Sequence, residues 1–332
     1  MKFALTRRAM LGAPVAAGMV VAAGAAMAQD KIQLRMSTVA TETDQRSVAL
    51  AEVFGPGVAE FASYEAHYNG TLFKQATELE AIARGNLEMA ITSAQELATF
   101  FPEFSVFTAG YLHRDAAHQV AVFNDPLMDP FKAKAEEELG VKLLTVMYLG
   151  RRHVNLRGEQ EVKTPADLAG VKLRMPGTDA WQFLGTALGA NPVPMAFGEV
   201  YTGLQSGAID GQDNPLPTVR DSKFYEVTKQ IVLTSHLVDL NYLAISKKVW
   251  DAMTPEQQAA TQAAADAAAE AARTKQLGLE DELVAFFKEQ GLKVYEPDLE
   301  AFRTKVQGDY LASEYAASWP AGIVDAINAL AQ

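Results

Sequence analysis

The sequence predicts an α/β protein of about two domains, and three observations predict it. Segments with strand-like alternation and segments with helical spacing follow one another along the chain, which is typical of sheets with crossover connections. The 332 residues, 49% hydrophobic and 21% charged, can bury a sizeable core and suggest about two domains. Residues 254–291 predict one unusually long C-terminal helix, or two end to end, which can brace two domains.

The first 28 residues predict a signal peptide and not a part of the fold. Lys2, Arg7 and Arg8 precede an apolar, Ala- and Gly-rich run, and residues 26–28 form an A-x-A cleavage site. The arginine pair resembles a twin-arginine (Tat) export signal, and the Sec route remains an alternative. Removing three positive charges from the net charge of −12 leaves −12 − 3 = −15. So acidic a chain is not expected to bind nucleic acid, and we expect a soluble, periplasmic protein that is a monomer.

The elements between the signal peptide and the long helix are predicted from periodicity and from capping residues. Thr164, Pro165 and Asp167 form the start signals of a short helix that Gly170 ends. In chain order the predicted elements are a strand at 31–38, a helix at 44–62, a strand and turn at 64–70, a helix and then a strand at 76–93, a buried strand at 140–150, the short helix at 164–170 and a strand at 170–177.

The long C-terminal helix has clear signals at both ends. Thr254 and Gln257 match a capping box, Pro255 occupies the first helical position and Gly291 ends the pattern. The segment is rich in alanine, which has the highest helix propensity. A stripe of large apolar residues supports the same interpretation: Leu279, Leu283, Phe286 and Phe287.

No motif supplies a nucleophile with its base. The chain has no cysteine, and its five histidines show no His-Glu-x-x-His spacing. The sequence His-Arg-Asp at 113–115 matches part of a kinase catalytic loop, but neither a Gly-rich phosphate loop nor Asp-Phe-Gly accompanies it. We therefore expect no catalytic residues, no metal site and no cofactor.

The strand at 170–177 raises one question that its own residues leave open. Val171, Leu173 and Met175 alternate with Lys172 and Arg174, so one face is apolar and the other is charged. Most arginines on such a face are solvated. The strand pattern alone does not decide whether Arg174 is solvated or binds a partner, so the rest of the sequence is needed.

The most specific segment is residues 170–215, which read GVKLRMPGTDAWQFLGTALGANPVPMAFGEVYTGLQSGAIDGQDNP. It resembles the signature region of the DctP-type substrate-binding proteins of tripartite ATP-independent periplasmic (TRAP) transporters. Stretches at 78–118, 140–152 and 223–253 agree in the same order, and the sialic-acid-binding branch is the most similar. The resemblance covers essentially all of the chain after the signal peptide.

This resemblance implies a fold like that of type II periplasmic binding proteins, with two α/β lobes, hinge strands and a long C-terminal helix that spans both lobes. We expect lobe 1 to comprise residues 29–149 and 241–279, and lobe 2 to comprise residues 150–240 and 280–332. The ligand is expected in the cleft between the lobes, which close on it.

The resemblance also assigns ligand-binding residues. Arg174, in LRMP, falls on the carboxylate-binding arginine of the family, and a planar guanidinium suits a carboxylate. Arg152 falls on a second arginine, Asn214 on an asparagine that reads the ligand, and Phe197 on an aromatic residue of the cleft.

Four positions depart from the sialic-acid branch, where the corresponding residues read the N-acetyl and glycerol parts of the ligand. They are four sites that comprise five residues: Ser37, the Lys74–Gln75 pair, Ser93 and Glu96. The carboxylate end is kept and the far end is changed, so a 2-keto-3-deoxy sugar acid such as a deoxy-octulosonate is as well supported as sialic acid.

The function that the resemblance implies is capture of such a carboxylate and its delivery to the membrane permease of a TRAP transporter. An exported enzyme acting on sugar acids is the alternative.

Overall fold

The structure is a computed structural model that describes residues 31–331 of the chain. The predicted signal peptide, residues 1–28, lies outside the described residues. Among those residues, no helix is both long enough and apolar enough to cross a membrane.

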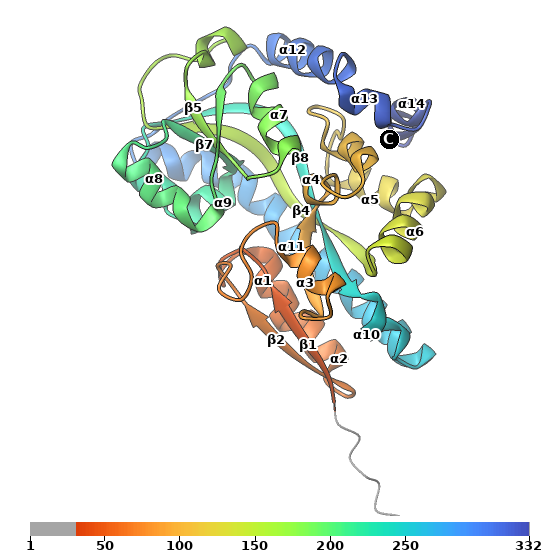
Figure 1. The fold of residues 1–332 in the computed structure, drawn as a ribbon. Coiled ribbons are helices and arrows are strands. Elements are labelled where there is room, and N and C mark those ends of the chain that lie inside the picture. Colours follow the sequence, from red (N-terminus) through yellow and green to blue (C-terminus); the bar gives the residue numbers. More distant parts are fainter. Residues whose placement is uncertain (1–30, 332) are drawn as a thin grey trace, which may run out of the picture. The chain divides into compact units, whose positions relative to one another are not determined.

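One mixed sheet organises the described part of the chain. Its nine strands are β1 (Ile32–Ser37), β2 (Ala62–His67), β3 (Met89–Ser93), β4 (Val141–Leu156), β5 (Lys172–Met175), β6 (Asn191–Pro194), β7 (Gly211–Pro215), β8 (Gln230–Ser246) and β9 (Lys293–Tyr295). They lie in the order β2-β1-β3-β8-β4-β7-β5-β6, and β9 pairs with β8. β1 pairs in parallel with β2 and β3, and β5 pairs in parallel with β6 and β7. The long antiparallel pair β4–β8 joins these two parallel groups (Figure 1).

Helices connect and cover the strands. They are α1 (Gln45–Ala49), α2 (Gly55–Val58), α3 (Glu78–Ala83), α4 (Ala94–Leu97), α5 (Ala116–Asn124), α6 (Asp129–Glu138), α7 (Asp179–Ala187), α8 (Val200–Ser206), α9 (Leu216–Asp221), α10 (Lys247–Asp251), α11 (Pro255–Glu289), α12 (Leu299–Leu311), α13 (Glu314–Ser318) and α14 (Ile323–Ala329).

The predicted elements are present, with two differences. The helix expected at 44–62 is α1 and α2 joined by a π-helical turn, Leu50–Phe54, and β2 begins at Ala62. The short helix at 164–170 is a 3₁₀ turn, Pro165–Leu168, and it has the expected capping box of Thr164 and Asp167. Short connecting pieces of this kind are where 3₁₀ geometry is common.

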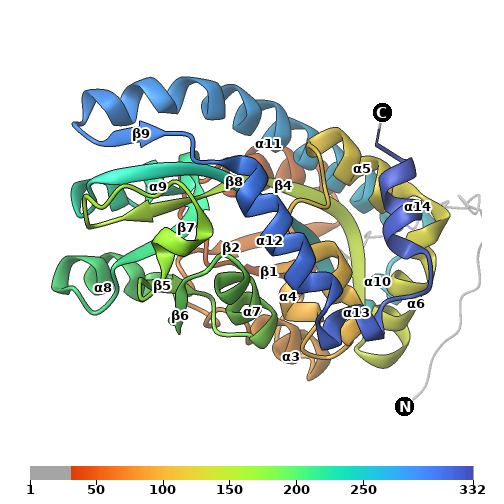
Figure 2. The ribbon, with the colours of Figure 1, turned by 90° about the horizontal axis from the view of Figure 1, so that it is seen from above.

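The long C-terminal helix is one uninterrupted helix, α11, and it begins at the predicted capping box of Thr254 and Gln257. Its alanine-rich first part packs with β1 and the α1–α2 segment, in a cluster that contains Leu34, Met36 and Phe54. Its second part packs with α8 and α9 through Leu279, Leu283 and Phe287. Figure 2 shows α11 running along the sheet, where it packs on β4. The helix therefore braces both parallel groups of the sheet.

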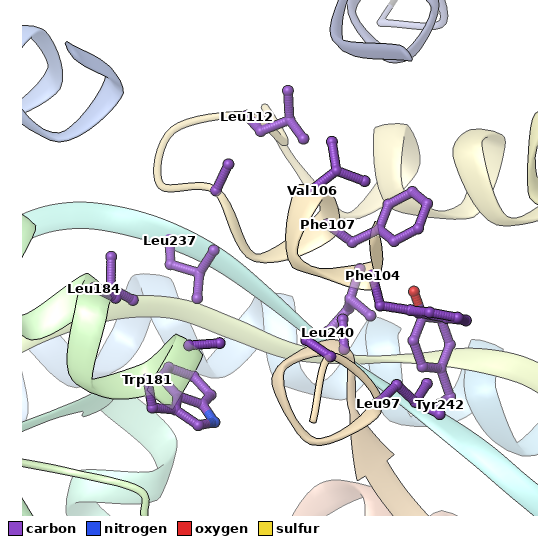
Figure 3. Packing of buried hydrophobic residues seen from close by; sticks show 14 of the residues in the cluster. Leu97, Phe104, Val106, Phe107, Leu112, Trp181, Leu184, Leu237, Leu240 and Tyr242 are labelled. Atoms are coloured by element: carbon purple, nitrogen blue, oxygen red, sulfur yellow. The ribbon is translucent and has the colours of Figure 1, made fainter. Parts of the chain in front are cut away.

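The largest hydrophobic cluster joins residues from distant parts of the chain (Figure 3). Phe104, Phe107, Trp181, Leu184 and Leu237 all belong to it. Because it contains residues of both expected lobes, and because the residues from Ile32 onward form one compact unit, the lobe boundaries at 149/150, 240/241 and 279/280 stay a prediction.

A bulge in β4 is held by α11. The register against β8 shifts between Tyr148 and Gly150, and Gly150 has φ +128°. A Cβ atom there would lie 2.6 Å from an Oε1 atom of Glu280, so only glycine fits this close approach. The same Glu280 oxygen accepts the Arg151 backbone N–H at 2.7 Å. Bulges bend a strand and increase its twist, so α11 fixes the path of β4 just before Arg152.

Candidate functional site

One pocket gathers most of the predicted ligand-binding residues. About 670 Å³ of space between atoms, part of it open to solvent, lies within it. Seven of the eight predicted residues line it: Arg174, Arg152, Asn214, Phe197, Gln75, Ser93 and Glu96. Ser37 does not; it is fully buried, and the next residue, Thr38, lines the pocket instead. Successive residues of an extended segment point to opposite sides, so Ser37 points away from the pocket and Thr38 points toward it.

Strand register spreads the lining residues across the sheet. Ser93 in β3 pairs with Asn241 in β8. Arg152 lies in β4, and Arg174 in β5 pairs with Gln212 in β7. The pocket therefore crosses five neighbouring strands, β3-β8-β4-β7-β5, with Ser93 at one end and Arg174 at the other.

Arg174 is a buried cation without an anionic partner. It is 1% exposed, and the described residues form no ion pair with it. Its Nε donates to the Met195 carbonyl at 2.9 Å and its Nη2 to Gln75 Oε1 at 2.9 Å, while its guanidinium lies 5.7 Å from the centre of the Phe197 ring. Burial lowers the pKa of Arg174 to about 9, so the group is still charged at neutral pH. The charges of Asp213 and Glu199 act on Arg174 without an ion pair. A buried charge without a bonded counter-charge is costly, and a ligand carboxylate in the pocket would supply one.

Arg152 has a different environment, because two carboxylates already neutralise it. Its Nε lies 2.6 Å from Asp213 Oδ2 and its Nη1 2.8 Å from Asp239 Oδ2, and the guanidinium packs 4.5 Å from the centre of the Trp181 ring. Burial raises the pKa of Asp213, but Arg152 and the hydrogen bond to His236 outweigh it, so that pKa is below its usual value. Burial raises the pKa of Asp239 despite Arg152. Arg152 thus holds a buried charge cluster together beside the pocket.

A second buried ion pair lines the pocket and was not predicted from the sequence. Arg46 Nε lies 2.9 Å from Asp44 Oδ1 and Nη2 lies 2.8 Å from Asp44 Oδ2, and Nη1 donates to Asn241 Oδ1. All three residues line the pocket. Asp44 also caps α1, and an aspartate before a helix is usually read as a cap only. No local pattern relates residue 46 to residue 241, so the sequence carries no signal for this group.

Asn214 and two further side chains offer unpaired hydrogen-bonding atoms. Asn214 Nδ2 donates to Gln212 Oε1 at 2.6 Å, and no hydrogen bond to a described residue uses its Oδ1. Trp181 Nε1 and Thr218 Oγ1 are buried atoms of lining residues, and no described residue bonds to them. Buried polar atoms are normally hydrogen-bonded, so the Trp181 and Thr218 atoms are unusual, and the Asn214 oxygen can accept a hydrogen bond from a ligand hydroxyl. Trp181 and Thr218 were missed because neither has a recognisable spacing to the others.

Ser93 and Glu96 form a capping box at the start of α4. The Glu96 backbone N–H donates to Ser93 Oγ at 3.1 Å, and Glu96 Oε2 accepts from the Ser93 N–H at 2.9 Å and from Thr92 Oγ1 at 2.9 Å. Burial raises the pKa of Glu96. Behind it, burial and the charge of Glu96 raise the pKa of the buried Glu78 to about 9. Ionisation of one of these two carboxyl groups therefore disfavours ionisation of the other.

This pair makes stability depend on pH. The pKa of Glu78 is higher in the folded protein than in the unfolded chain, so protonation of Glu78 stabilises the fold. This stabilisation is fully present below about pH 4.5 and is lost as pH rises toward 9. We expect Glu78→Gln to raise the free energy of unfolding at pH 8 by about 1–3 kcal/mol and to change it little at pH 4. Denaturant unfolding at both pH values measures this, with Glu80→Gln on the exposed side of α3 as the control. Equal stability of wild type and Glu78→Gln at pH 8 would contradict it.

Comparison with known proteins identifies a family that this chain matches. Residues 57–316 match the bacterial extracellular solute-binding proteins, family 7 (DctP). A TRAP periplasmic solute-binding protein from Roseobacter denitrificans, solved with bound 3-deoxy-D-manno-oct-2-ulosonic acid (KDO), is 70% identical; the match covers 91% of this chain and 100% of that one, with a TM-score of 0.90.

Two further relatives bind acidic sugars. The sialic acid-binding periplasmic protein SiaP of Vibrio cholerae is 31% identical over 70% of this chain and 72% of its own. The 2,3-diketo-L-gulonate-binding periplasmic protein YiaO of Escherichia coli is 29% identical over 79% and 80%. These matches confirm the predicted resemblance and the fold class. The chain belongs to the DctP family of bacterial extracellular solute-binding proteins.

Proposed function

We propose that this protein is the periplasmic solute-binding component of a TRAP transporter and that it captures a 2-keto-3-deoxy sugar acid, KDO or a close analogue, for delivery to the membrane permease. The observation that carries the proposal is Arg174, a buried cation that lines the pocket and has no anionic partner among the described residues. The relative with 70% identity, solved with bound KDO, supports the choice of ligand.

The carboxylate end of the ligand is assigned to Arg174. A guanidinium offers two parallel N–H donors to a carboxylate, and the bond is stronger where water is excluded. Asn214 Oδ1 can accept a hydroxyl of the same ligand, and the Phe197 ring can pack on the apolar face of the sugar. Arg152 already has two carboxylates, so its role is to fix the floor of the site beneath the sugar.

The far end of the pocket favours hydroxyl groups over an N-acetyl group. Ser93 and Glu96 satisfy one another, and Asp44, Arg46 and Asn241 form a closed set of hydrogen bonds. The oxygens of these side chains can each accept a further hydrogen bond, which a ligand hydroxyl can donate, whereas an acetyl methyl group would exclude water from them without replacing its hydrogen bonds, at about 1–3 kcal/mol each. A non-acetylated eight-carbon acid therefore suits this end better than sialic acid.

A titration series tests the proposal. We expect KDO to bind more tightly than N-acetylneuraminic acid in calorimetry, and KDO at a hundredfold excess over Kd to add roughly 2.7 kcal/mol to the free energy of unfolding. The ligand is then released by denaturation and compared with the starting compound by mass spectrometry. Chemically altered KDO would favour the alternative of an exported enzyme. Tighter binding of N-acetylneuraminic acid would contradict the ligand assignment.

A further inference from the structure

The strongest unexplained contact in the pocket is made by the side chain of Gln75. Its Oε1 accepts two hydrogen bonds, from Arg174 Nη2 at 2.9 Å and from the Phe197 backbone N–H at 3.1 Å. These donors are 99 and 122 residues away in sequence. The resemblance had assigned this position to the far end of the ligand, whereas the structure places Gln75 against the arginine of the carboxylate end.

The contact joins opposite ends of the sheet. Gln75 lies in the loop that follows β2, and Arg174 lies in β5. Five strands, β1, β3, β8, β4 and β7, separate β2 from β5. Six spacings of about 4.8 Å would put these strands roughly 29 Å apart in a flat sheet. Because Gln75 lies eight residues beyond the end of β2, the hydrogen bonds form only where this loop reaches across the sheet to the pocket that Gln75 and Arg174 both line.

The loop does not need these bonds to hold its own shape. Thr77 donates to the Lys74 carbonyl through its backbone N–H at 3.0 Å and through its hydroxyl at 2.8 Å. At the other end of the loop, the Asn69 and Gly70 backbone N–H groups donate to the carbonyls of Ala40 at 3.0 Å and Thr38 at 2.9 Å. The Gln75 side chain is thus free to serve the pocket, and its removal leaves the loop's own hydrogen bonds intact.

The chemistry of the amide explains why glutamine suits this position. Its oxygen satisfies two buried donors, but it carries no charge, so Arg174 gains no bonded counter-charge from it. A carboxylate at the same place would form the ion pair within the protein and compete with the ligand.

We propose that Gln75 is a clasp between the two ends of the sheet: it bonds to Arg174 and Phe197 on closure and leaves the charge of Arg174 for the ligand carboxylate. Capture of the anion and closure of the pocket then depend on the same guanidinium. This proposal rests on the proposed function for the identity of the ligand, but not for the clasp itself.

Two variants of the full chain, studied with the wild type, test it. Gln75→Glu is isosteric and places a carboxylate on Arg174, so we expect KDO affinity to fall at least a hundredfold in calorimetry. In small-angle scattering we expect the ligand-free Gln75→Glu protein to have the radius of gyration that the wild type reaches only with KDO. Gln75→Ala keeps the charge of Arg174 and loses the clasp, so we expect KDO dissociation to be about tenfold faster in stopped-flow measurements.

Thr71→Glu is the matched control, because Thr71 is exposed in the same loop and gains the same charge. We expect its KDO affinity to lie within twofold of wild type. Melting temperatures show that each variant is folded.

The outcomes separate this proposal from the proposed function. If Gln75→Glu binds KDO as tightly as wild type, or if it keeps the ligand-free radius of wild type, the clasp is wrong. If wild type fails to bind KDO while Gln75→Glu still contracts without ligand, the clasp stands and the ligand assignment fails. Unchanged dissociation from Gln75→Ala also overturns the clasp.

Discussion

Replacing Arg174 with lysine is expected to weaken KDO binding by about 2–4 kcal/mol, or roughly 30- to 1000-fold, although the positive charge is kept. Lysine cannot reproduce the geometry: the guanidinium donates through Nε to Met195 and through Nη2 to Gln75, and it still has N–H groups for a carboxylate. An ammonium group acts as a point charge and cannot form the two parallel bonds.

Calorimetry with KDO measures the effect, and Lys172→Ala is the control. Lys172 is exposed on the same strand, so its loss should leave the affinity within about twofold of wild type. The control shows whether binding needs a positive charge at residue 174 or only positive charge on this strand. Near-native affinity of the Arg174→Lys protein would show that the carboxylate binds elsewhere in the pocket.

The second large effect concerns stability. Arg152→Met is expected to lower the free energy of unfolding by about 3–5 kcal/mol, because it leaves two buried carboxylates without their cation. Asp213 and Asp239 are both buried and both bonded to this guanidinium at 2.6–2.8 Å. In a chain of this size we expect the melting temperature to fall by about 5–15 °C.

A rescue experiment separates the lost charge from the lost side chain. The triple variant Arg152→Met, Asp213→Asn, Asp239→Asn removes the unpaired charges and should regain a large part of the stability, since neutral replacement of a whole buried ion group is often tolerated. Thermal unfolding measures all variants. A single Arg152→Met variant with the stability of wild type, or a triple variant less stable than the single one, would contradict this account.

The order of helices and strands along the chain was predictable, because the spacing of apolar residues and the capping residues are local features of the sequence. Alternation identified β1 and β5, and the capping box at Thr254 identified the start of α11. Helix subtypes were not predictable, because a π turn at Leu50–Phe54 and a 3₁₀ turn at Pro165–Leu168 use the same residue types as an α-helix. The resemblance supplied most of the pocket, but the pairing of Arg46 with Asn241 and the contact of Gln75 with Arg174 join residues 195 and 99 positions apart, which no local pattern relates.

The order of strands in the sheet also bears on how the chain can assemble. β3 ends at Ser93, and the residue it pairs with there is Asn241 in β8, so 241 − 93 = 148 residues separate the partners. During synthesis, β3 has only β1 beside it until β8 follows, and one edge of the first parallel group stays open. Such distant pairings form late because the long loop must close first, and open strand edges invite association with other chains. A nascent chain that ends before residue 230 lacks the strand that closes this edge, so folding of the N-terminal part is tied to completion of the chain.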